Sequence, residues 1–389
     1  MAFEFIPRSL EQRRQQHLLR NPVMVDSSVG AIITVQNRHY LNFSSNDYLG
    51  QRQSQQVMQA WVEGIAEYGV GSGSSPLVTG HTKSHQQLED YLADQLNRDR
   101  ALLFSSGFAA NQAITQALLH KDADVISDKL MHASFIDGAM HSDARFRRFR
   151  HNDLDHLDGL LGAKQHDTLV ATEGVFSMDG DDGELAKISQ RCVEHDAWLM
   201  VDDAHGIGVR GKTGLGSIQD SGLSQHQVPI VMGTFGKAIG TAGAFIAGSD
   251  DLISYLINFA KHYIYSTAMP PALAHATLVS FQQIADAQQQ QKLMSHIARF
   301  QRLCNQAKIP VMASNSAIQP VIIGDPQRCT QVSEKLKQLG IWVSPIRYPT
   351  VSKHTDRLRI TLSASHHDAD IDALVDGLAL ALTPTSQSQ

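Results

Sequence analysis

One lysine, Lys237, lies in a glycine-rich segment that follows an apolar run of the chain. A lysine amine that is desolvated or held near another cation forms a Schiff base with carbonyl compounds. The segment is not a phosphate-binding P-loop, because Val231 and Ala238 stand where that motif requires a glycine and a hydroxyl residue. Residues 233–240 therefore suit either a carbonyl-binding lysine or an ordinary loop lysine.

A second polar cluster, Val201-Asp202-Asp203-Ala204-His205-Gly206, also ends an apolar run. Pyridoxal phosphate needs a carboxylate at its pyridine nitrogen to act as an electron sink, and a histidine nearby could bond the neighbouring ring oxygen. The alternative is a helix-capping aspartate beside a surface histidine. Residues 206–211 match G-x-G-x-x-G, but glycine-rich loop follows where a dinucleotide site needs a helix, so we exclude that site.

A third segment, residues 104–111, runs from an apolar stretch through Gly107 into an amphipathic pattern. The first backbone N–H groups of a helix are free and form a ready phosphate site. Such turns also occur without a ligand. The histidines, 19 in all, show no H-E-x-x-H pattern, and the sequence has no C-x-x-C, so we expect no metal site.

The elements that must position these residues alternate between short apolar runs and helical patterns. This alternation predicts an α/β fold with a mostly parallel sheet, whose site lies at the carboxyl ends of its strands. The three polar clusters follow strands in this way. The strands expected are 101–104, 124–127, 168–172, 198–201, 230–232 and 243–247.

The two ends of the chain do not follow this regular alternation of strands and helices. We expect a helix over 8–20 and a hairpin over 31–43 that turns at Gln36-Asn37. A long helix should start after Pro271 and continue through the glutamine-rich stretch 282–291. Strands at 318–323, 341–344 and 357–362, with helices at 329–339 and from 368, predict a smaller α+β domain. The domains expected are 1–50, 51–275 and 276–389.

Composition narrows the possible functions. The 389 residues carry a net charge of −6, which argues against nucleic acid as the main partner. The basic run at 144–150 is interpreted as a solvated turn. No apolar stretch reaches membrane-spanning length, no signal peptide is visible, and three widely spaced cysteines form no disulfide framework. We therefore expect a reduced, cytoplasmic protein.

Eight segments, taken together and in order, resemble the α-oxoamine synthases, which are pyridoxal-phosphate enzymes of the aspartate-aminotransferase fold (PLP fold type I). The resemblance extends from about residue 8 to about residue 382. The segments are SSNDYLG (44–50), GSGSSPLVTGHTKSHQQLE (71–89), LFSSGFAANQA (103–113), HAS (132–134), TEGVFSMDGD (172–181), VDDAHGIG (201–208), TFGKAIG (234–240) and YSTAMPP (265–271).

The resemblance implies a role for each matching residue. Lys237 would hold the cofactor covalently, Asp202 would pair with its pyridine nitrogen, and His205 would bond its phenolic oxygen. His132 would stack on the open face of the ring and assist catalysis. Further cofactor contacts are implied for Gly107, Phe108, Ser177 and Thr234, and across a homodimer interface for Ser266 and Thr267. Substrate contacts are implied as well: Asn46 and Arg359 would bind the amino-acid carboxylate, Arg20 would lie at the acyl-chain entrance and Thr350 near the acyl substrate. His132 would also contact the substrate.

The motifs are most similar to members that join L-alanine to a pimeloyl thioester, on coenzyme A or acyl carrier protein, in biotin biosynthesis. Sibling enzymes share the cofactor site and differ in amino acid and acyl chain. They include glycine C-acetyltransferase, serine palmitoyltransferase, 5-aminolevulinate synthase and quorum-signal synthases. A cofactor-binding sensor without catalysis is a further alternative, although Lys237, Asp202, His132 and Arg359 are all present.

Overall fold

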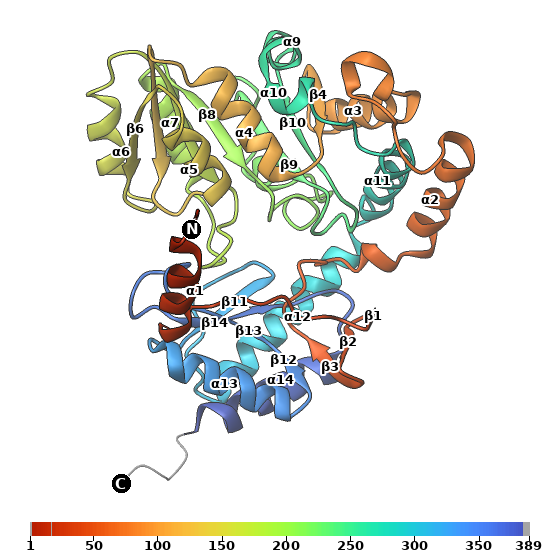
Figure 1. The fold of residues 1–389 in the computed structure, drawn as a ribbon, viewed down its shortest axis with the longest axis vertical. Coiled ribbons are helices and arrows are strands. Elements are labelled where there is room, and N and C mark those ends of the chain that lie inside the picture. Colours follow the sequence, from red (N-terminus) through yellow and green to blue (C-terminus); the bar gives the residue numbers. More distant parts are fainter. Residues whose placement is uncertain (1, 17, 384–389) are drawn as a thin grey trace.

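The computed structural model describes residues 2–16 and 18–383, and its larger part contains a seven-stranded sheet (Figure 1). Its strands are β4 (Arg100–Phe104), β5 (Ala123–Asp128), β6 (Arg145–Phe149), β7 (Asp167–Glu173), β8 (Trp198–Asp202), β9 (Ile230–Thr234) and β10 (Ala244–Gly248). They lie in the order β4-β10-β9-β8-β7-β5-β6. The strands from β9 to β6 are parallel, and β10 is antiparallel to both of its neighbours. The predicted α/β fold with a mostly parallel sheet is confirmed.

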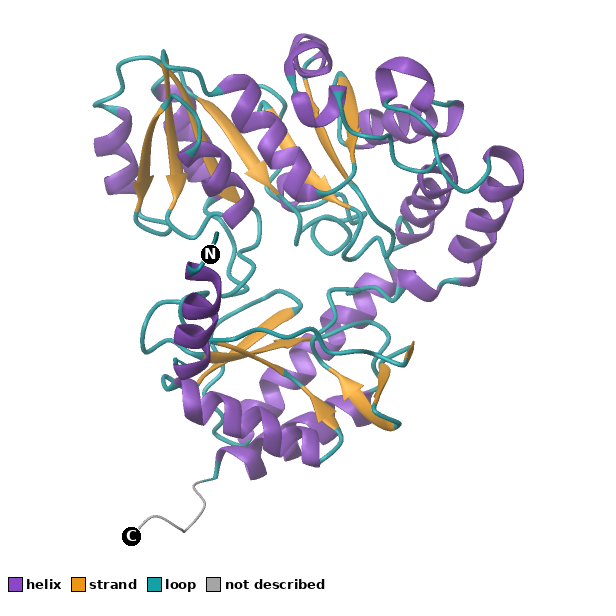
Figure 2. Ribbon diagram, viewed as in Figure 1, coloured by secondary structure: helices purple, strands orange, loops and turns teal. Residues whose placement is uncertain are grey.

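Both faces of this sheet are covered by helices, because its strands are apolar on both sides (Figure 2). In β4, Leu102 packs in one buried cluster with helices α4, α5 and α9, while Leu103 packs in the opposite cluster with α3, α6, α7 and α11. The helices are α2 (Gln55–Tyr68), α3 (Lys83–Gln95), α4 (Gly107–Leu118), α5 (Ala133–Met140), α6 (Leu154–Leu161), α7 (Leu185–Glu194), α8 (Ser217–Asp220), α9 (Asp250–Phe259), α10 (Lys261–Ile264) and α11 (Pro271–Ile284).

The basic run was wrongly interpreted as a turn, since it forms β6 at one edge of the sheet. Arg145 Nε lies 2.8 Å from Asp124 Oδ1, and Arg147 also pairs with this fully buried carboxylate. The arginines therefore balance a buried charge of the neighbouring strand. Charged side chains on an edge strand also discourage pairing with another chain.

The smaller part combines both ends of the chain (Figure 1). The hairpin is confirmed: strands Ile32–Val35 (β2) and Arg38–Asn42 (β3) meet at Gln36 and Asn37, whose φ angles are 51° and 59°. β3 pairs in parallel with β12, so the N-terminal strands join the C-terminal region. The other elements of the smaller part are α1 (Phe5–Gln15), β1 (Ser27–Val29), α12 (Gln288–Gln306), β11 (Ile318–Ile322), α13 (Pro326–Gln338), β12 (Ile341–Trp342), β13 (Ser344–Ile346), β14 (Arg357–Thr361) and α14 (Asp368–Leu382). Two single turns, at Gln51–Gln53 and Pro76–Gly80, contact α2 and α10 of the larger part.

The long helix expected through 282–291 is interrupted. Helix α11 ends at Ile284, and α12 begins at Gln288 after Ala287 adopts a positive φ of 59°. Helix α11 packs on α2 and α3 of the larger part, whereas α12 packs on α14 of the smaller part. The break redirects the chain from the larger part to the smaller part, and the periodicity of the glutamine-rich stretch does not predict it. Among the described residues, no helix is long and apolar enough to cross a membrane.

Gly240 closes the turn that carries Lys237, and neither its backbone conformation nor its surroundings suit a side chain. Gly240 has a φ of 74° and donates its N–H to the Lys237 carbonyl at 2.9 Å, and an added Cβ would press on the backbone nitrogen of Arg52. Gly222 has a similar φ of 65° but open space around it. We expect Gly222→Ala to lower the Tm by about 2 °C, and Gly240→Ala by roughly 5 °C or more. Equal shifts in thermal unfolding would refute the steric argument.

Candidate active site

Lys237 follows β9 and meets His205 at the carboxyl edge of the sheet. Lys237 Nζ lies 2.7 Å from His205 Nε2. Burial lowers the pKa of Lys237 to about 8, although Asp202 and Glu173 act in the opposite direction. An amine with this pKa is partly uncharged near neutral pH, which both nucleophilic attack on a carbonyl and proton abstraction require.

A chain of hydrogen bonds continues from His205 into the smaller part. Tyr48 Oη lies 2.7 Å from His205 Nδ1 and donates to Asn46 Oδ1 at 3.1 Å. Arg359 Nη1 donates to the same Asn46 oxygen at 3.2 Å. Because Tyr48 donates to Asn46, it accepts from His205 Nδ1–H, and Nε2 is left to accept from Lys237. Burial and nearby cations hold the pKa of His205 well below its usual value, so the imidazole is neutral.

Asp202 ends β8 and is the centre of a second network. Its carboxylate accepts from Asn111 Nδ2 at 2.9 Å and from the Ala204 N–H at 3.1 Å. Asn111 Nδ2 also donates to Ser134 Oγ at 2.9 Å, and that hydroxyl lies 2.6 Å from His132 Nδ1. Asp202, His132 and Lys237 influence one another electrostatically, and burial lowers the pKa of His132.

The remaining residues expected around the cofactor occupy three places. Ser106 caps α4, accepting from the Ala109 N–H at 3.1 Å. Within the described chain, the N–H groups of Gly107 and Phe108 donate to no protein acceptor. A Cβ on Gly107 would lie 3.8 Å from Thr234 Cβ, so those two positions adjoin. Ser177 follows β7. The last pair, Ser266 and Thr267, lines a small 20 Å³ cavity with His81, His85 and Glu89.

These side chains fit pyridoxal phosphate. In the part of the chain that the structure describes, the buried Asp202 carboxylate forms no ion pair with a side-chain cation, and Lys237 forms none with a carboxylate. A buried charge without a partner is costly, and a pyridinium nitrogen would supply the partner of Asp202. The start of α4 offers free N–H groups to a phosphate, and the exposed His132 imidazole offers a flat face to a ring.

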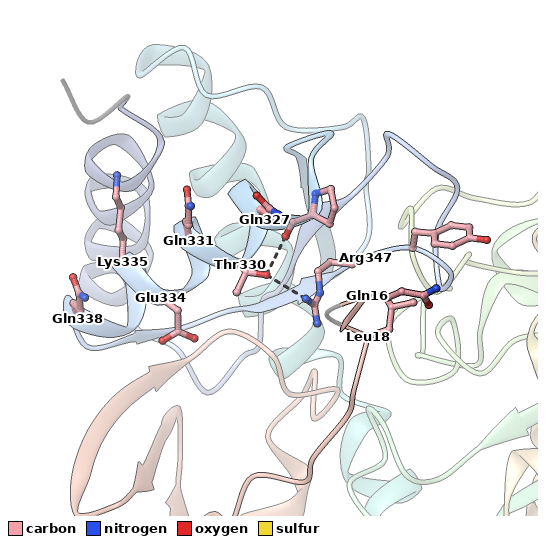
Figure 3. Close-up of a pocket in the computed structure, with 11 residues that line it drawn as sticks. Gln16, Leu18, Gln327, Thr330, Gln331, Glu334, Lys335, Gln338 and Arg347 are labelled. Carbon is pink, nitrogen blue, oxygen red and sulfur yellow. Dashed lines mark hydrogen bonds between the residues drawn. The ribbon is translucent and has the colours of Figure 1, made fainter. Parts of the chain in front are cut away.

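The two residues expected at the acyl substrate lie together, in a different place. Arg20 Nη2 donates to Thr350 Oγ1 at 3.2 Å, and both line a 260 Å³ pocket with Arg13 and Arg347. A larger pocket of 1020 Å³ shares Leu18, Arg347 and Tyr348 with it and extends along α13, between that helix and the N-terminal segment (Figure 3). No hydrogen bond of the described residues joins Arg20 or Thr350 directly to the Lys237 network.

The structure adds four residues that the sequence analysis gave no role: Tyr48, Asn111, Ser134 and Glu173. Tyr48 and Asn111 stand inside motifs but depend on contacts far along the chain. Glu173 ends β7 in register with Asp202 of β8, so adjacent parallel strands place two carboxyls side by side. Burial, together with Asp202, raises the pKa of Glu173 well above its usual value. The register of the strands could have suggested this pair.

Known proteins provide an independent comparison. The family model for aminotransferases of class I and II matches residues 38–378. An 8-amino-7-oxononanoate synthase of Alcanivorax borkumensis is 46% identical, covering 98% of this chain and 99% of its own. The synthase of Thioalkalivibrio sulfidiphilus is 47% identical, covering 95% of each chain.

Solved structures agree with the sequence relatives. Serine palmitoyltransferase (SPT) of Sphingomonas wittichii superimposes with a TM-score of 0.92 at 27% identity, covering 98% of each chain. An SPT variant solved with PLP gives 0.91 at 26% identity, covering 97% of each chain. The 8-amino-7-oxononanoate synthase of Francisella tularensis gives 0.78 at 32% identity, covering 88% of this chain and 97% of its own. With the lysine, aspartate and histidine positions in place, this chain belongs to the class I and II aminotransferase family of pyridoxal-phosphate enzymes, in its α-oxoamine synthase branch.

Proposed function

We propose that the chain condenses L-alanine with a pimeloyl thioester, on coenzyme A or acyl carrier protein, and releases 8-amino-7-oxononanoate, carbon dioxide and the free thiol carrier. The near full-length identity of 46–47% to synthases of that name supports the substrates. The observation that carries the chemistry is the hydrogen-bonded chain from the Lys237 amine to Arg359. It places a base and a carboxylate-binding guanidinium in one connected unit.

The chain's own residues divide the work of the reaction. When bound, pyridoxal phosphate supplies an electron sink for negative charge at the α-carbon of the amino acid. Lys237 removes the α-proton, which suits an amine whose pKa is lowered to about 8. With the cofactor bound, Asp202 would pair with the ring nitrogen and keep it protonated, and His205 would bond the phenolic oxygen. His132 would face the ring and would hold the keto oxygen of the condensed product as carbon dioxide leaves.

Arg359 and Asn46 orient the amino acid. A guanidinium bonds a carboxylate through two parallel N–H groups. Arg359 is mostly buried, with Nε and Nη1 already bonded to Ser177 O and Asn46 Oδ1. Its position therefore fixes where the carboxylate of alanine binds and which bond at the α-carbon stands perpendicular to the cofactor ring.

The enzyme works as a homodimer with shared active sites, in the cytoplasm. Helix α2 presents Met58, Val62 and Ile65 to solvent, and Phe108 and Tyr265 are 52% and 78% exposed beside the expected phosphate site. We assign these two exposed apolar places to the homodimer interface. A second copy would cover them and bring its Ser266 and Thr267 to the phosphate. The three free, buried cysteines suit a reducing compartment.

The test of this function is a panel of alanine, glycine and serine against pimeloyl and octanoyl thioesters on coenzyme A, with pimeloyl-acyl carrier protein as a further arm. The cofactor-loaded protein should release the free thiol carrier fastest when alanine is combined with a pimeloyl thioester. Mass spectrometry of that reaction should detect 8-amino-7-oxononanoate. A preference for glycine or serine would assign the chain to a sibling activity.

The two adjacent aspartates should behave differently. Asp202→Asn removes the charge that holds the ring nitrogen, so we expect cofactor retention about 10- to 100-fold weaker with little change in Tm. Asp203 is fully buried and accepts from Ser217 N at 2.6 Å and Ser217 Oγ at 2.7 Å. Asp203→Asn should lower the Tm and keep the cofactor. The content of bound cofactor and the Tm are measured on both variants. Equal cofactor loss in the two variants would contradict the assignment of Asp202 to the ring nitrogen.

Arg20 is proposed to bind the distal carboxylate of the pimeloyl chain. A guanidinium–carboxylate contact of this kind contributes about 1.5–3 kcal/mol, so Arg20→Ala should lower kcat/KM for the pimeloyl thioester about 10- to 100-fold. Octanoyl thioester lacks the distal charge and should lose little, and alanine binding to the cofactor should stay the same. An equal loss with both thioesters, or no loss with either, would remove Arg20 from this role.

A further inference from the structure

The loop between β7 and α7, residues 174–183, connects the larger part of the molecule with the smaller part. It is closed on itself, because the Phe176 N–H donates to Asp181 O at 2.9 Å and the Gly183 N–H donates to Gly174 O at 3.0 Å. These bonds hold the two arms of the loop together. A constraint on one end of it is therefore transmitted to the other.

On the side of the smaller part, the loop holds Arg359. Arg359 Nε donates to the Ser177 carbonyl at 2.7 Å. Arg357, two residues earlier on the same strand and therefore on the same face, forms an ion pair with Asp179. Ser314 Oγ donates to the Gly180 carbonyl at 2.7 Å. The loop thus provides one of the two acceptors that position the Arg359 guanidinium, and Asn46 Oδ1 is the other.

On the side of the larger part, His151 ties the same loop to the sheet. His151 Nε2 lies 2.7 Å from Asp181 Oδ2, in the loop, and His151 Nδ1 lies 3.1 Å from Asp128 Oδ1, at the end of β5. The Phe176 ring stands edge-on to the imidazole, at 4.4 Å between centroids and 87° between planes. The sequence analysis gave His151 no role, and the proposed mechanism does not use it.

The charges around His151 favour a permanent bridge. Asp128 is fully buried and also accepts from the Leu130 N–H at 2.7 Å and the Asn152 N–H at 3.0 Å. Both imidazole nitrogens face carboxylates, so both must donate, which only the protonated ring can do. Burial opposes that charge, but the two carboxylates outweigh it and raise the pKa of His151 to about 10. The His151 imidazole is therefore protonated near neutral pH, and it donates to both carboxylates.

We propose that His151 is a positioning residue for amino-acid binding: by bridging Asp128 and Asp181 it fixes the loop whose Ser177 carbonyl orients Arg359. This inference rests on the proposed function, in which Arg359 binds the carboxylate of alanine. It predicts a defect that is confined to ligands with a carboxylate.

The first test compares two ligands on cofactor-loaded protein. Alanine has a carboxylate for Arg359, and ethylamine has none. Absorbance titration of His151→Gln should give a Kd for alanine raised about tenfold, the effect of weakening one hydrogen bond to a charged group, with the Kd for ethylamine within twofold of the unsubstituted protein. In turnover, KM for alanine should rise more than kcat falls. Exposed His166, replaced in His166→Gln, is the matched control and should change neither Kd.

Two further variants separate positioning from general stability. Asp181→Ala breaks the bridge at the loop and keeps the buried pair of His151 with Asp128, so it should also weaken alanine but not ethylamine. It serves as the test if His151→Gln does not fold. In the double variant His151→Gln with Asp181→Asn, the glutamine amide can bond Asp128 on one side and the new asparagine amide of the loop on the other. The bridge is then restored, and the loop no longer carries a carboxylate without a partner. Alanine affinity should return to within about threefold of the unsubstituted protein.

The outcomes distinguish this inference from the proposed function. Equal weakening of alanine and ethylamine, or unchanged alanine binding in both single variants, would overturn the positioning role. Failure of the double variant to recover alanine affinity would also contradict it. If the unsubstituted protein itself does not bind alanine, the proposed function fails instead, whatever the His151 variants do.

Discussion

The site depends on holding the Lys237 amine out of water beside a neutral imidazole. Burial alone would leave an unpaired cation, which is costly, so the protein weakens the charge by lowering the pKa to about 8. His205 Nε2 can accept a hydrogen bond from the amine because the pKa of His205 is held low and its Nδ1–H donates to Tyr48 Oη. The direction of each bond from Lys237 to Arg359 follows from this arrangement.

The second requirement is a buried negative charge that the protein does not neutralise with a cation of its own. Asp202 has only neutral donors, Asn111 and a backbone N–H, among its described hydrogen-bond partners. Asp203, its neighbour, is also buried, but Ser217 satisfies its carboxylate. The contrast explains why one aspartate suits a cofactor and the other suits the stability of the fold. Alternation along the chain at the end of β8 turns the two side chains to different surroundings.

The smaller part of the molecule contributes the residues that we propose to bind the amino-acid substrate. Asn46 follows the N-terminal hairpin, and Arg359 lies on β14, near the C-terminus. They meet because the chain from Phe43 to Tyr48 runs beside β14 and the residues that follow it: the Thr361 N–H donates to Phe43 O and the Ala364 N–H donates to Tyr48 O, both at 2.8 Å. Loop 174–183 in turn joins β14 to the large sheet. A carboxylate-binding group held by such a joint is sensitive to residues that never touch the substrate, and His151 is placed to be one of them.

The sequence by itself determined the parallel sheet, the hairpin turn at Gln36-Asn37 and the residue types of the cofactor site. Each of these depends on local patterning: apolar strand runs, residues that tolerate positive φ, and polar clusters at strand ends. The break at Ala287, the strand formed by the basic run at 145–149, and the links from Tyr48 to His205 and from Asn111 to Asp202 depended on packing between distant segments. Periodicity contains no information on which buried side chains meet. Only the tertiary structure, by burying Lys237 and Glu173, decided the direction in which their pKa values move and hence their chemistry.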